Sequence, residues 1–415
     1  MKRRDAIRSA LAVGAGCLAG CLDQFDQESV GGGLDGWSMF RANSYNTGRL
    51  DDTRGPADDP RVSWSVQTGG DIWGSAAVAQ ERVYIPSYDG YCYAFDATDG
   101  SELWRYELGE VTDSSPAITE ELVVLGGFDK RIHGIDRETG DRRWRFDADG
   151  IVRSSPTIRD GTVYIGTHCQ VAECRRDVYD INPDGPGYLV ALDGGTGEVR
   201  WRFETGAGVV STPAIDETTA YVGGTDGVVY AVDRESGEEE WTFETNEAIF
   251  SSPALEGETL YIGDTAGVVF AIDVSDGTEE WHFQLPPRMK EGSPAVGDDT
   301  IFIGSGGFGH GSVIYGIDRA DGTETWSTGV SGVVLGSSPA LVQDRIYVGT
   351  LVPETNETAS QSGAMVALST SGDLVWELTV DADFNGGGEG FGSSPAVDNG
   401  RLVVGSESGH LYSIE

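Results

Sequence analysis

One unit of about 40 residues recurs along this chain, and a repeat of this length restricts the fold more than any other feature of the sequence. Each copy begins with small residues, usually Ser or Thr followed by Pro and Ala, and carries a tryptophan near its far end. The small-residue segments begin at Ser75, Ser115, Ser155, Thr212, Ser252, Ser293, Ser338 and Ser394. The tryptophans are Trp64, Trp104, Trp144, Trp201, Trp241, Trp281, Trp326 and Trp376. Both sets have eight members, so we count eight units.

The residue pattern of each unit predicts four β-strands. The small-residue segment is followed by a β-branched and aromatic piece such as residues 260–263, and then by a third piece such as residues 228–233, while the fourth piece carries the tryptophan. Four antiparallel strands per repeat of about 40 residues are typical of a β-propeller blade. We therefore expect an all-β, eight-bladed β-propeller of four-stranded antiparallel blades. Seven blades is the alternative, and it requires one of the units to be misread.

The order of the two repeated features predicts how the ring closes. The first tryptophan precedes the first small-residue segment, and the last unit stops at Glu415 without a tryptophan. We therefore expect the N-terminal strand around Trp64 to complete the C-terminal blade that begins at Ser394. Pairing the two ends of the propeller in this way leaves no open sheet edge between the first and last blades.

The turn before each tryptophan follows a common pattern. Six copies place Asp at the start of the turn and Gly four residues later, as in Asp233 and Gly237. The Asp side chain can cap the turn, Gly permits a positive φ, and the Trp ring offers a flat surface for packing between blades. The seventh copy, "LSTSGDLVW", is one residue shorter and lacks the Asp, so we expect an atypical turn there.

These turns, together with "WSMFRANSYNTG" at residues 37–48, resemble the PQQ-like repeat of the quinoprotein alcohol dehydrogenase-like propellers. The motif Ala-x-Asp-x-x-Thr-Gly-x-x-x-Trp is most complete from Ala191 through Trp201, and the resemblance covers residues 37–415. It implies the propeller fold, which serves both dehydrogenases and non-catalytic proteins. A single propeller behind a lipid anchor resembles the BamB-like lipoproteins, which are scaffolds.

The N-terminal residues are typical of a processing signal rather than of folded structure. Arg3 and Arg4 precede a short, weakly apolar run that ends in Leu-Ala-Gly before Cys21, which resembles a twin-arginine signal peptide with a lipobox. We expect export and attachment, through a lipid on Cys21, to the outer side of the cytoplasmic membrane. We assign residues 1–20 to the signal peptide, 21–36 to a flexible tether, 37–59 to a segment that packs on the propeller, and 60–415 to the propeller.

The formal net charge is −40, with 68 acidic residues against 28 basic ones, of which 3 are lysines. Such a surface repels nucleic acid and anionic lipid head groups, so we exclude both as partners. Molar salt has a Debye length of about 3 Å and would screen the self-repulsion of the chain. The composition therefore resembles that of haloarchaeal, halophilic proteins, with an acidic protein from an ordinary environment as the alternative. No apolar run is long enough to indicate a transmembrane helix.

Strand direction alternates within a blade, so the connections form two sets on opposite faces. The first-to-second and third-to-fourth turns, which define the uniform face, vary little in length. The second-to-third turns and the blade-to-blade connections define the insertion face, whose insertions are 167–187, 284–292, 305–312, 350–363 and 381–392. Repeat proteins commonly bind on the face where insertions gather, so we expect a partner or ligand there. The candidate binding residues are His168, Arg175, Arg176, Arg288, Lys290 and His310, with simple solvation as the alternative for the basic ones.

Three of the cysteines bear on chemistry within the propeller. Cys169 and Cys174 are candidates for a disulfide, which export favours, or for a metal site together with His168. Cys92 occupies the place of Ile132 and other aliphatic residues in the neighbouring repeats, so we expect it in the core.

Three further motifs lie in or beside the insertions. Part of a calcium-loop pattern is present, but Gly392 stands where a bidentate Glu belongs, so an acidic Gly-rich loop is the alternative. The candidate calcium ligands are Asp381, Asp383, Asn385 and Glu389. Asn356 begins a glycosylation sequon. A Gly-x-Gly-x-x-Gly pattern at residues 304–309 leads into a strand rather than a helix, so we reject it as a dinucleotide site.

Three functions remain: a protein-interaction scaffold, a PQQ- and calcium-dependent dehydrogenase, and a propeller that binds a small ligand such as a sugar. The dehydrogenase would need a cofactor pocket, a calcium site and a carboxylate base, and no carboxylate among so many can be singled out. The adjacent cysteine pair of some relatives is missing, and so are a Ser-His-Asp grouping and a P-loop. We therefore favour a monomeric, non-catalytic scaffold with no required cofactor, whose partners are other cell-surface or secreted proteins.

Overall fold

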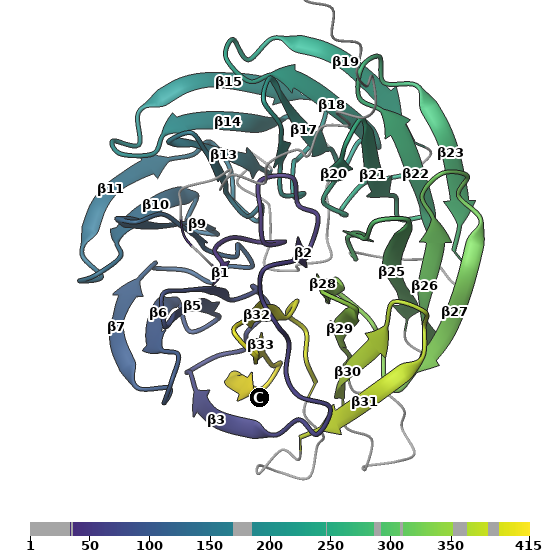
Figure 1. Cartoon of the computed structure of the whole chain (residues 1–415). Coiled ribbons are helices and arrows are strands. Elements are labelled where there is room, and N and C mark those ends of the chain that lie inside the picture. The colour runs from purple at the N-terminus through teal and green to yellow at the C-terminus, as the bar shows by residue number, and fades with distance from the viewer. Residues whose placement is uncertain are drawn as a thin grey trace, which may run out of the picture.

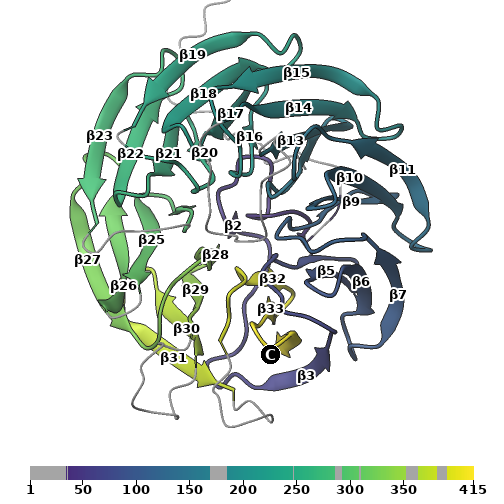
Figure 2. The ribbon, with the colours of Figure 1, turned by 180° about the vertical axis from the view of Figure 1, so that it is seen from behind.

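The computed structural model describes residues 34, 36–168, 185–245, 247–285, 292–307, 310–351, 363–380 and 390–415, except for the side chains of residues 307, 310 and 311. The described residues form eight sheets arranged around a central axis, and Figures 1 and 2 show this ring from its two sides. The predicted all-β, eight-bladed propeller is confirmed. Within these ranges no helix is long and apolar enough to cross a membrane.

The first four blades follow one another along the chain. Blade 1 consists of β4 (Ala77–Ala79), β5 (Arg82–Ser87), β6 (Tyr91–Asp96) and β7 (Glu102–Glu107), with β1 (Gly36–Trp37) added to β4. Blade 2 consists of β8 (Ala117–Ile118), β9 (Leu122–Gly127), β10 (Arg131–Asp136) and β11 (Arg142–Asp147). Blade 3 consists of β12 (Thr157–Arg159), β13 (Thr162–Thr167), β14 (Gly187–Asp193) and β15 (Val199–Thr205). Blade 4 consists of β16 (Ala214–Ile215), β17 (Thr219–Gly223), β18 (Val228–Asp233) and β19 (Glu239–Glu244).

The last four blades include two more strands from the N-terminal part of the chain. Blade 5 consists of β20 (Ala254–Glu256), β21 (Thr259–Gly263), β22 (Val268–Asp273) and β23 (Glu279–Gln284). Blade 6 consists of β24 (Ala295–Val296), β25 (Thr300–Gly307), β26 (His310–Asp318) and β27 (Glu324–Val330). Blade 7 consists of β28 (Ala340–Val342), β29 (Arg345–Gly349), β30 (Ala364–Ser369) and β31 (Leu374–Thr379), with β2 (Arg49–Leu50) added to β28. Blade 8 consists of β32 (Ala396–Asp398), β33 (Arg401–Gly405), β34 (His410–Ile414) and β3 (Val62–Gln67).

Blade 8 joins the two ends of the propeller. Its outermost strand is β3, which pairs antiparallel with β34 so that Val66 faces Leu411 and Gln67 faces His410. The backbone of Arg61 continues this ladder through two hydrogen bonds of 2.9 Å with Glu415. The strand that contains Trp64 therefore completes the last blade, and every blade has two neighbours.

Burial differs between the strands of a blade. The second and third strands are almost fully buried, as in β13 and β18, because both of their faces pack against adjacent blades. The outermost strand alternates between exposed polar residues and inward ones, and in β15 the ring of Trp201 points inward. The hydrophobic core is consequently divided into clusters between neighbouring blades, and one of them combines Tyr164 of blade 3 with Val222 of blade 4.

The tryptophans hold neighbouring blades together. In seven of the eight blades the indole Nε1 donates a hydrogen bond of 2.8–3.0 Å to a backbone carbonyl in the next blade's Asp-Gly turn or its shorter counterpart. The glycine of each such turn has φ between +71° and +87°, and a Cβ there would lie 2.5–2.9 Å from the ring. The eighth, Trp376, is buried beside Tyr347. Seven of the eight tryptophans thus dock on the turn of the next blade.

The Asp side chains cap these turns as the sequence predicts. The Asp233 carboxylate accepts hydrogen bonds from the hydroxyl and the N–H of Ser236, and these bonds lower the pKa of Asp233 below its ordinary value. In the turn that lacks the Asp, the hydroxyl of Ser369 accepts a hydrogen bond of 3.0 Å from the N–H of Asp373 instead. The atypical seventh turn is thus capped by a serine.

Residues 36–54 lie across one end of the central channel. This segment crosses the middle of the ring in Figure 1 between β1 and β2. Its backbone carbonyls accept hydrogen bonds from the inner strands of blades 2, 4, 5, 6 and 7, and from the turn after β32 in blade 8. The guanidinium of Arg41 is 1% exposed and donates to the carbonyl oxygens of Pro294 and Pro339. Because β1 starts opposite Ala79, beside the first-to-second turn of blade 1, the segment enters the channel from the uniform face.

Candidate functional site

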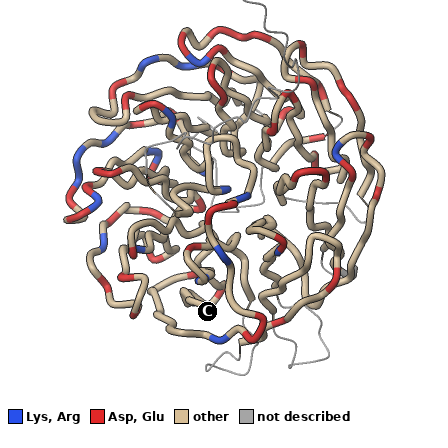
Figure 3. Tube along the Cα trace, in the orientation of Figure 1, with Lys and Arg blue, Asp and Glu red and all other residues tan. Residues whose placement is uncertain are grey.

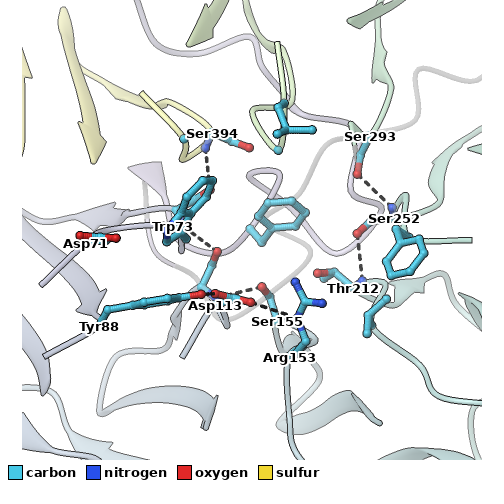
Figure 4. Close-up of a pocket in the computed structure, with 18 residues that line it drawn as sticks. Asp71, Trp73, Tyr88, Asp113, Arg153, Ser155, Thr212, Ser252, Ser293 and Ser394 are labelled. Carbon is cyan, nitrogen blue, oxygen red and sulfur yellow. Dashed lines mark hydrogen bonds and ion pairs between the residues drawn. The ribbon is translucent and has the colours of Figure 1, made fainter. Parts of the chain in front are cut away.

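A cavity of about 350 Å³ lies in the central channel and opens on the insertion face. Its wall is formed mainly by blade-to-blade connections, and Figure 4 shows their side chains converging on the channel axis. Phe40 also lines the cavity and comes from the segment that crosses the channel. The cavity volume is near the lower end of the range of about 300–1,000 Å³ that small-ligand sites usually have.

One side chain per blade occupies equivalent places in this wall. The position is the second residue before each small-residue segment, and the amino acids there are Trp73, Asp113, Arg153, Val210, Phe250, Glu291, Gly336 and Gly392. Seven of the eight are described, and all seven line the cavity. The repeat is nearly constant around this position, but the position itself carries a different residue in almost every blade. The eight blades are therefore similar in structure, but the side chains that they place around the cavity differ.

A ring of hydroxyl groups surrounds the cavity, and we call it the serine belt. Its members are Ser75, Ser115, Ser155, Thr212, Ser252, Ser293, Ser338 and Ser394. In seven of the eight steps around the ring, the backbone N–H of one member donates a hydrogen bond of 2.8–3.0 Å to the hydroxyl oxygen of the next. Every member is at most 6% exposed, and seven of them line the cavity. The strand starts recognised in the sequence are thus also the blade-to-blade joints.

The preceding serine of the double-serine pattern has a different role. Ser114, Ser211 and their equivalents in blades 5, 7 and 8 accept a hydrogen bond from a glycine N–H near the end of the second strand of the same blade. The first serine of the pair therefore forms a hydrogen bond within its own blade, and the second forms one with a neighbouring blade. This division of roles explains why two hydroxyl residues recur side by side.

The charged part of the wall is a short chain of paired groups. The hydroxyl of Tyr88 donates a hydrogen bond to one carboxylate oxygen of Asp113, and Nε of Arg153 lies 3.0 Å from the other. Asp71 lies at the rim, where partial burial raises the pKa of its carboxyl above the ordinary value. The opposite part of the wall is apolar, with Phe250 among its residues.

The residues singled out in the sequence have different positions. Cys92 is fully buried, as predicted, and burial raises the pKa of its thiol. His168 directly follows the second strand of blade 3, is only 6% exposed and does not line the cavity, so its side chain is not an accessible part of the insertion face. Burial and the charge of Arg153 lower the pKa of His168 to about 4.

The remaining candidates lie outside the residues or side chains that the structure describes. They are the lipidation residue Cys21, the cysteines Cys169 and Cys174, the calcium candidates Asp381, Asp383, Asn385 and Glu389, the sequon residue Asn356, and the face residues Arg175, Arg176, Arg288, Lys290 and His310. The described residues of the cavity wall were not predicted from the sequence as a site. The available signal was a position that varies between otherwise constant repeats.

The described residues allow a test of the cofactor groups that the resemblance implies. Among them, no group of three or more His, Cys, Asp or Glu side chains is arranged to hold a metal ion. The cavity wall offers one guanidinium, that of Arg153, which is already paired with Asp113, while Asp71 adds a second carboxylate. PQQ carries three carboxylates, which this set of side chains would repel rather than neutralise. The described wall therefore does not fit that cofactor.

Comparison with solved structures shows the same architecture in proteins of low sequence identity. BamB from Moraxella catarrhalis is 18% identical with a TM-score of 0.66, over 86% of this chain and 99% of that one. The quinohemoprotein alcohol dehydrogenase from Comamonas testosteroni is 13% identical with a TM-score of 0.71, over 91% of this chain and 80% of that one. A europium-containing methanol dehydrogenase is 12% identical with a TM-score of 0.69, over 91% of this chain and 98% of that one. At these identities the likeness shows the fold alone.

Comparison at the level of sequence shows the family. A search of curated proteins finds no match. The family model described as outer membrane protein assembly factor BamB matches residues 56–185, 178–307 and 309–415, which together span nearly the whole propeller. With its eight blades, its tryptophan-docked turns and this match, the chain belongs to the BamB family of PQQ-like β-propellers.

Proposed function

We propose that this protein is an exported, lipid-anchored, non-catalytic scaffold at the cell surface, and that it binds its partners through the insertion face. The observation that carries the proposal is the difference between the two ends of the channel. Residues 36–54 cover the end at the uniform face, whereas the end at the insertion face is an open cavity with a different side chain in almost every blade. Specific recognition requires a concave surface whose side chains vary. The repeated turns of the uniform face do not form such a surface.

The path of the chain adds an orientation to this proposal. Gly36 begins β1 beside the first-to-second turn of blade 1, so the chain that precedes it reaches the propeller on the uniform face. A lipid on Cys21 would be attached 15 positions before Gly36, a length that would span about 20 Å on average if it behaved as a flexible coil. The uniform face would then lie toward the membrane and the cavity would point away from it, toward soluble or neighbouring partners.

Site-directed photo-crosslinking in intact cells tests the scaffold proposal. A photoreactive residue at Val210, in the cavity wall, is compared with one at Glu138, an exposed residue in the turn between β10 and β11 on the uniform face. We expect discrete crosslinked products from the first position and none from the second. Products only from the uniform face, or the same products from both positions, would contradict the proposed binding face.

Two controls address the anchor and the chemistry. Cys21→Ser should release the protein into the medium, and retention of the variant at the membrane would contradict anchoring through that residue. Addition of PQQ with calcium to the purified protein in molar salt should change neither its melting temperature nor the reduction of a dye with alcohols and sugars. A saturable rise in melting temperature together with dye reduction would replace the scaffold proposal by a dehydrogenase.

Small-ligand binding is the second candidate function, and the cavity itself favours it. An aromatic side chain such as Trp73 and a paired Asp113–Arg153 in one concave site are typical of a pocket that orients a small organic molecule. This role is compatible with scaffolding, because a ligand can also be a group carried by a partner.

A further inference from the structure

The serine belt contains hydrogen-bond donors that have no acceptor in the described protein. Where a belt hydroxyl oxygen accepts a hydrogen bond from the N–H of the neighbouring member, the O–H group itself is still available as a donor. None of these hydroxyls donates to an acceptor among the described residues, although Ser75, Ser252 and Ser394 are each at most 5% exposed. Buried donors without partners cost free energy, so the belt is suited to a ligand or waters that bring acceptor oxygens to the axis.

The charges and the hydrogen-bond donors around the cavity select against two classes of ligand. An anion would meet the carboxylates of Asp71 and Asp113 within a chain of net charge −40, while the guanidinium of Arg153 is already neutralised by its ion pair. Acidic residues are distributed around the whole ring in Figure 3, so this repulsion acts from every side. A cation without acceptor atoms would leave the belt O–H groups of the described residues without hydrogen-bond partners. A neutral ligand rich in oxygen supplies acceptors to these groups and is not repelled by the carboxylates.

The aromatic residues add a second requirement. Trp73, Phe250 and Phe40 all line the cavity, and Trp73 packs on the apolar residues Leu335 and Leu351 while staying only partly buried. Large aromatic surfaces favour a ligand that has an apolar face. The pyranose ring of a neutral sugar combines a C–H face with a rim of hydroxyl groups, and each of those groups can both donate and accept hydrogen bonds. The oxygens of the sugar can accept hydrogen bonds from the belt hydroxyls and from the guanidinium of Arg153. Its O–H groups can donate to the carboxylates of Asp71 and Asp113.

We propose that the cavity binds a neutral sugar, with one face of the ring against the aromatic residues and its hydroxyl groups toward the serine belt. The inference rests on the proposed binding role of the insertion face and names the ligand class for that face. The sugar is either a free monosaccharide or the end of a glycan chain. The chemistry recognised is the same in both cases, and the cavity opens on one side, so it admits either.

Thr212 permits a substitution that separates binding from folding. The N–H of Thr212 donates to the hydroxyl of Ser252, but no belt N–H of the described residues donates to the hydroxyl of Thr212. Thr212→Val therefore removes one cavity hydroxyl at nearly constant shape and leaves every belt bond in place. Thr218→Val is the matched control, because Thr218 is exposed in the turn between β16 and β17 on the uniform face. Trp73→Leu tests the aromatic wall in the same way.

The experiment is isothermal titration calorimetry of the full mature chain in molar salt. The probes are D-glucose, D-galactose, D-mannose and N-acetyl-D-glucosamine, with choline and D-glucuronate as the cationic and anionic comparisons. We expect saturable binding of at least one neutral sugar and no binding of the charged probes. Thr212→Val should weaken that binding about two- to tenfold, as the loss of one hydrogen bond does, and Thr218→Val should leave it unchanged.

Each other outcome has a defined meaning. Binding of choline or glucuronate in preference to every neutral sugar would overturn the inference, and so would a cavity that binds none of the probes and holds only water. If Thr212→Val and Trp73→Leu both bind the sugar with the affinity of the parent protein, the sugar site lies outside this cavity and the inference is wrong. Tighter binding of maltose than of D-glucose would identify a glycan end, and the reverse a free sugar. Crosslinked partners without sugar binding would leave the scaffold proposal intact and reject only the ligand class.

Discussion

The backbone N–H of Ser394 donates a hydrogen bond of 3.0 Å to the hydroxyl oxygen of Ser75, 319 residues earlier in the chain. This bond joins blade 8 to blade 1 at the cavity wall and belongs to the belt that runs around the channel. The sheet pairing of β3 with β34 closes the ring within blade 8, and the belt closes it a second time at the axis. The first closure lies at the outermost strand of the blade and the second at the cavity wall.

Removal of one belt hydroxyl should destabilise the whole propeller. In Ser75→Ala the buried N–H of Ser394 loses its acceptor, and we expect the free energy of unfolding to fall by about 1–3 kcal/mol. Urea denaturation in molar salt measures the change, and Ser75→Thr should restore most of it because the oxygen is retained. Ser101→Ala, at an exposed turn residue, is the control. A Ser75→Ala variant as stable as this control would show that the belt bond contributes nothing.

A methyl group at a docking glycine should cost more than the same group at an unhindered one. Gly237 has φ +74°, and a Cβ there would lie 2.8 Å from the ring of Trp201. Gly257 has φ +64° with nothing within 4 Å of its Cβ. In Gly257→Ala the free energy of unfolding should fall by about 1–2 kcal/mol from backbone strain alone. In Gly237→Ala it should fall clearly further, because the ring of Trp201 must also move. Equal melting temperatures for the two variants would argue against a tight Trp–Gly contact.

Stability should depend on pH through His168. Its pKa is about 4 in the folded protein against an ordinary value of 6.5, so the unfolded chain takes up a proton between these pH values and the folded chain does not. The free energy of unfolding is therefore unaffected by this residue above pH 6.5 and falls as the pH decreases toward 4. At pH 5 the loss is about 2 kcal/mol.

His168→Gln isolates this contribution from that of the many carboxylates. We expect the variant to lose about 2 kcal/mol less than the parent protein when the pH is lowered from 7.5 to 5 in matched urea titrations. The carboxylates are common to both proteins and cancel in the difference. An identical loss in the two proteins would mean that the imidazole titrates at its ordinary pKa.

Salt should stabilise the fold strongly. The chain carries a net charge of −40, and self-repulsion is screened over about 10 Å at 0.1 M salt but over about 3 Å at 1 M. We expect the melting temperature to rise steeply with sodium chloride concentration and most of the rise to occur below 1 M. Sucrose at the same osmolality provides the comparison. A rise of the same size in sucrose would assign the effect to solvent exclusion rather than to charge screening.

The sequence alone determined the blades, because every signal for them is local and repeated. The Asp233–Gly237 turn contains its own cap and its own positive φ, so it can be recognised without knowing what surrounds it. The tryptophan offset even predicts which strand completes the last blade. The seventh turn shows the limit of this reasoning, since its irregularity is visible in the sequence but the serine that replaces the Asp is identified only by its hydrogen bond.

Only the tertiary structure decided the site, because its parts come from residues that are far apart in the chain. Arg41 looks like a surface charge in the sequence, yet it is buried because carbonyl groups of Pro294 and Pro339 converge on it from two other blades. His168 lies beside an insertion but is covered, since the connection before blade 4 packs over it at Gly208. A periodic pattern specifies how each unit folds on itself. The cavity depends on how eight units place their differing residues around one axis, and that arrangement exists only once the ring has closed.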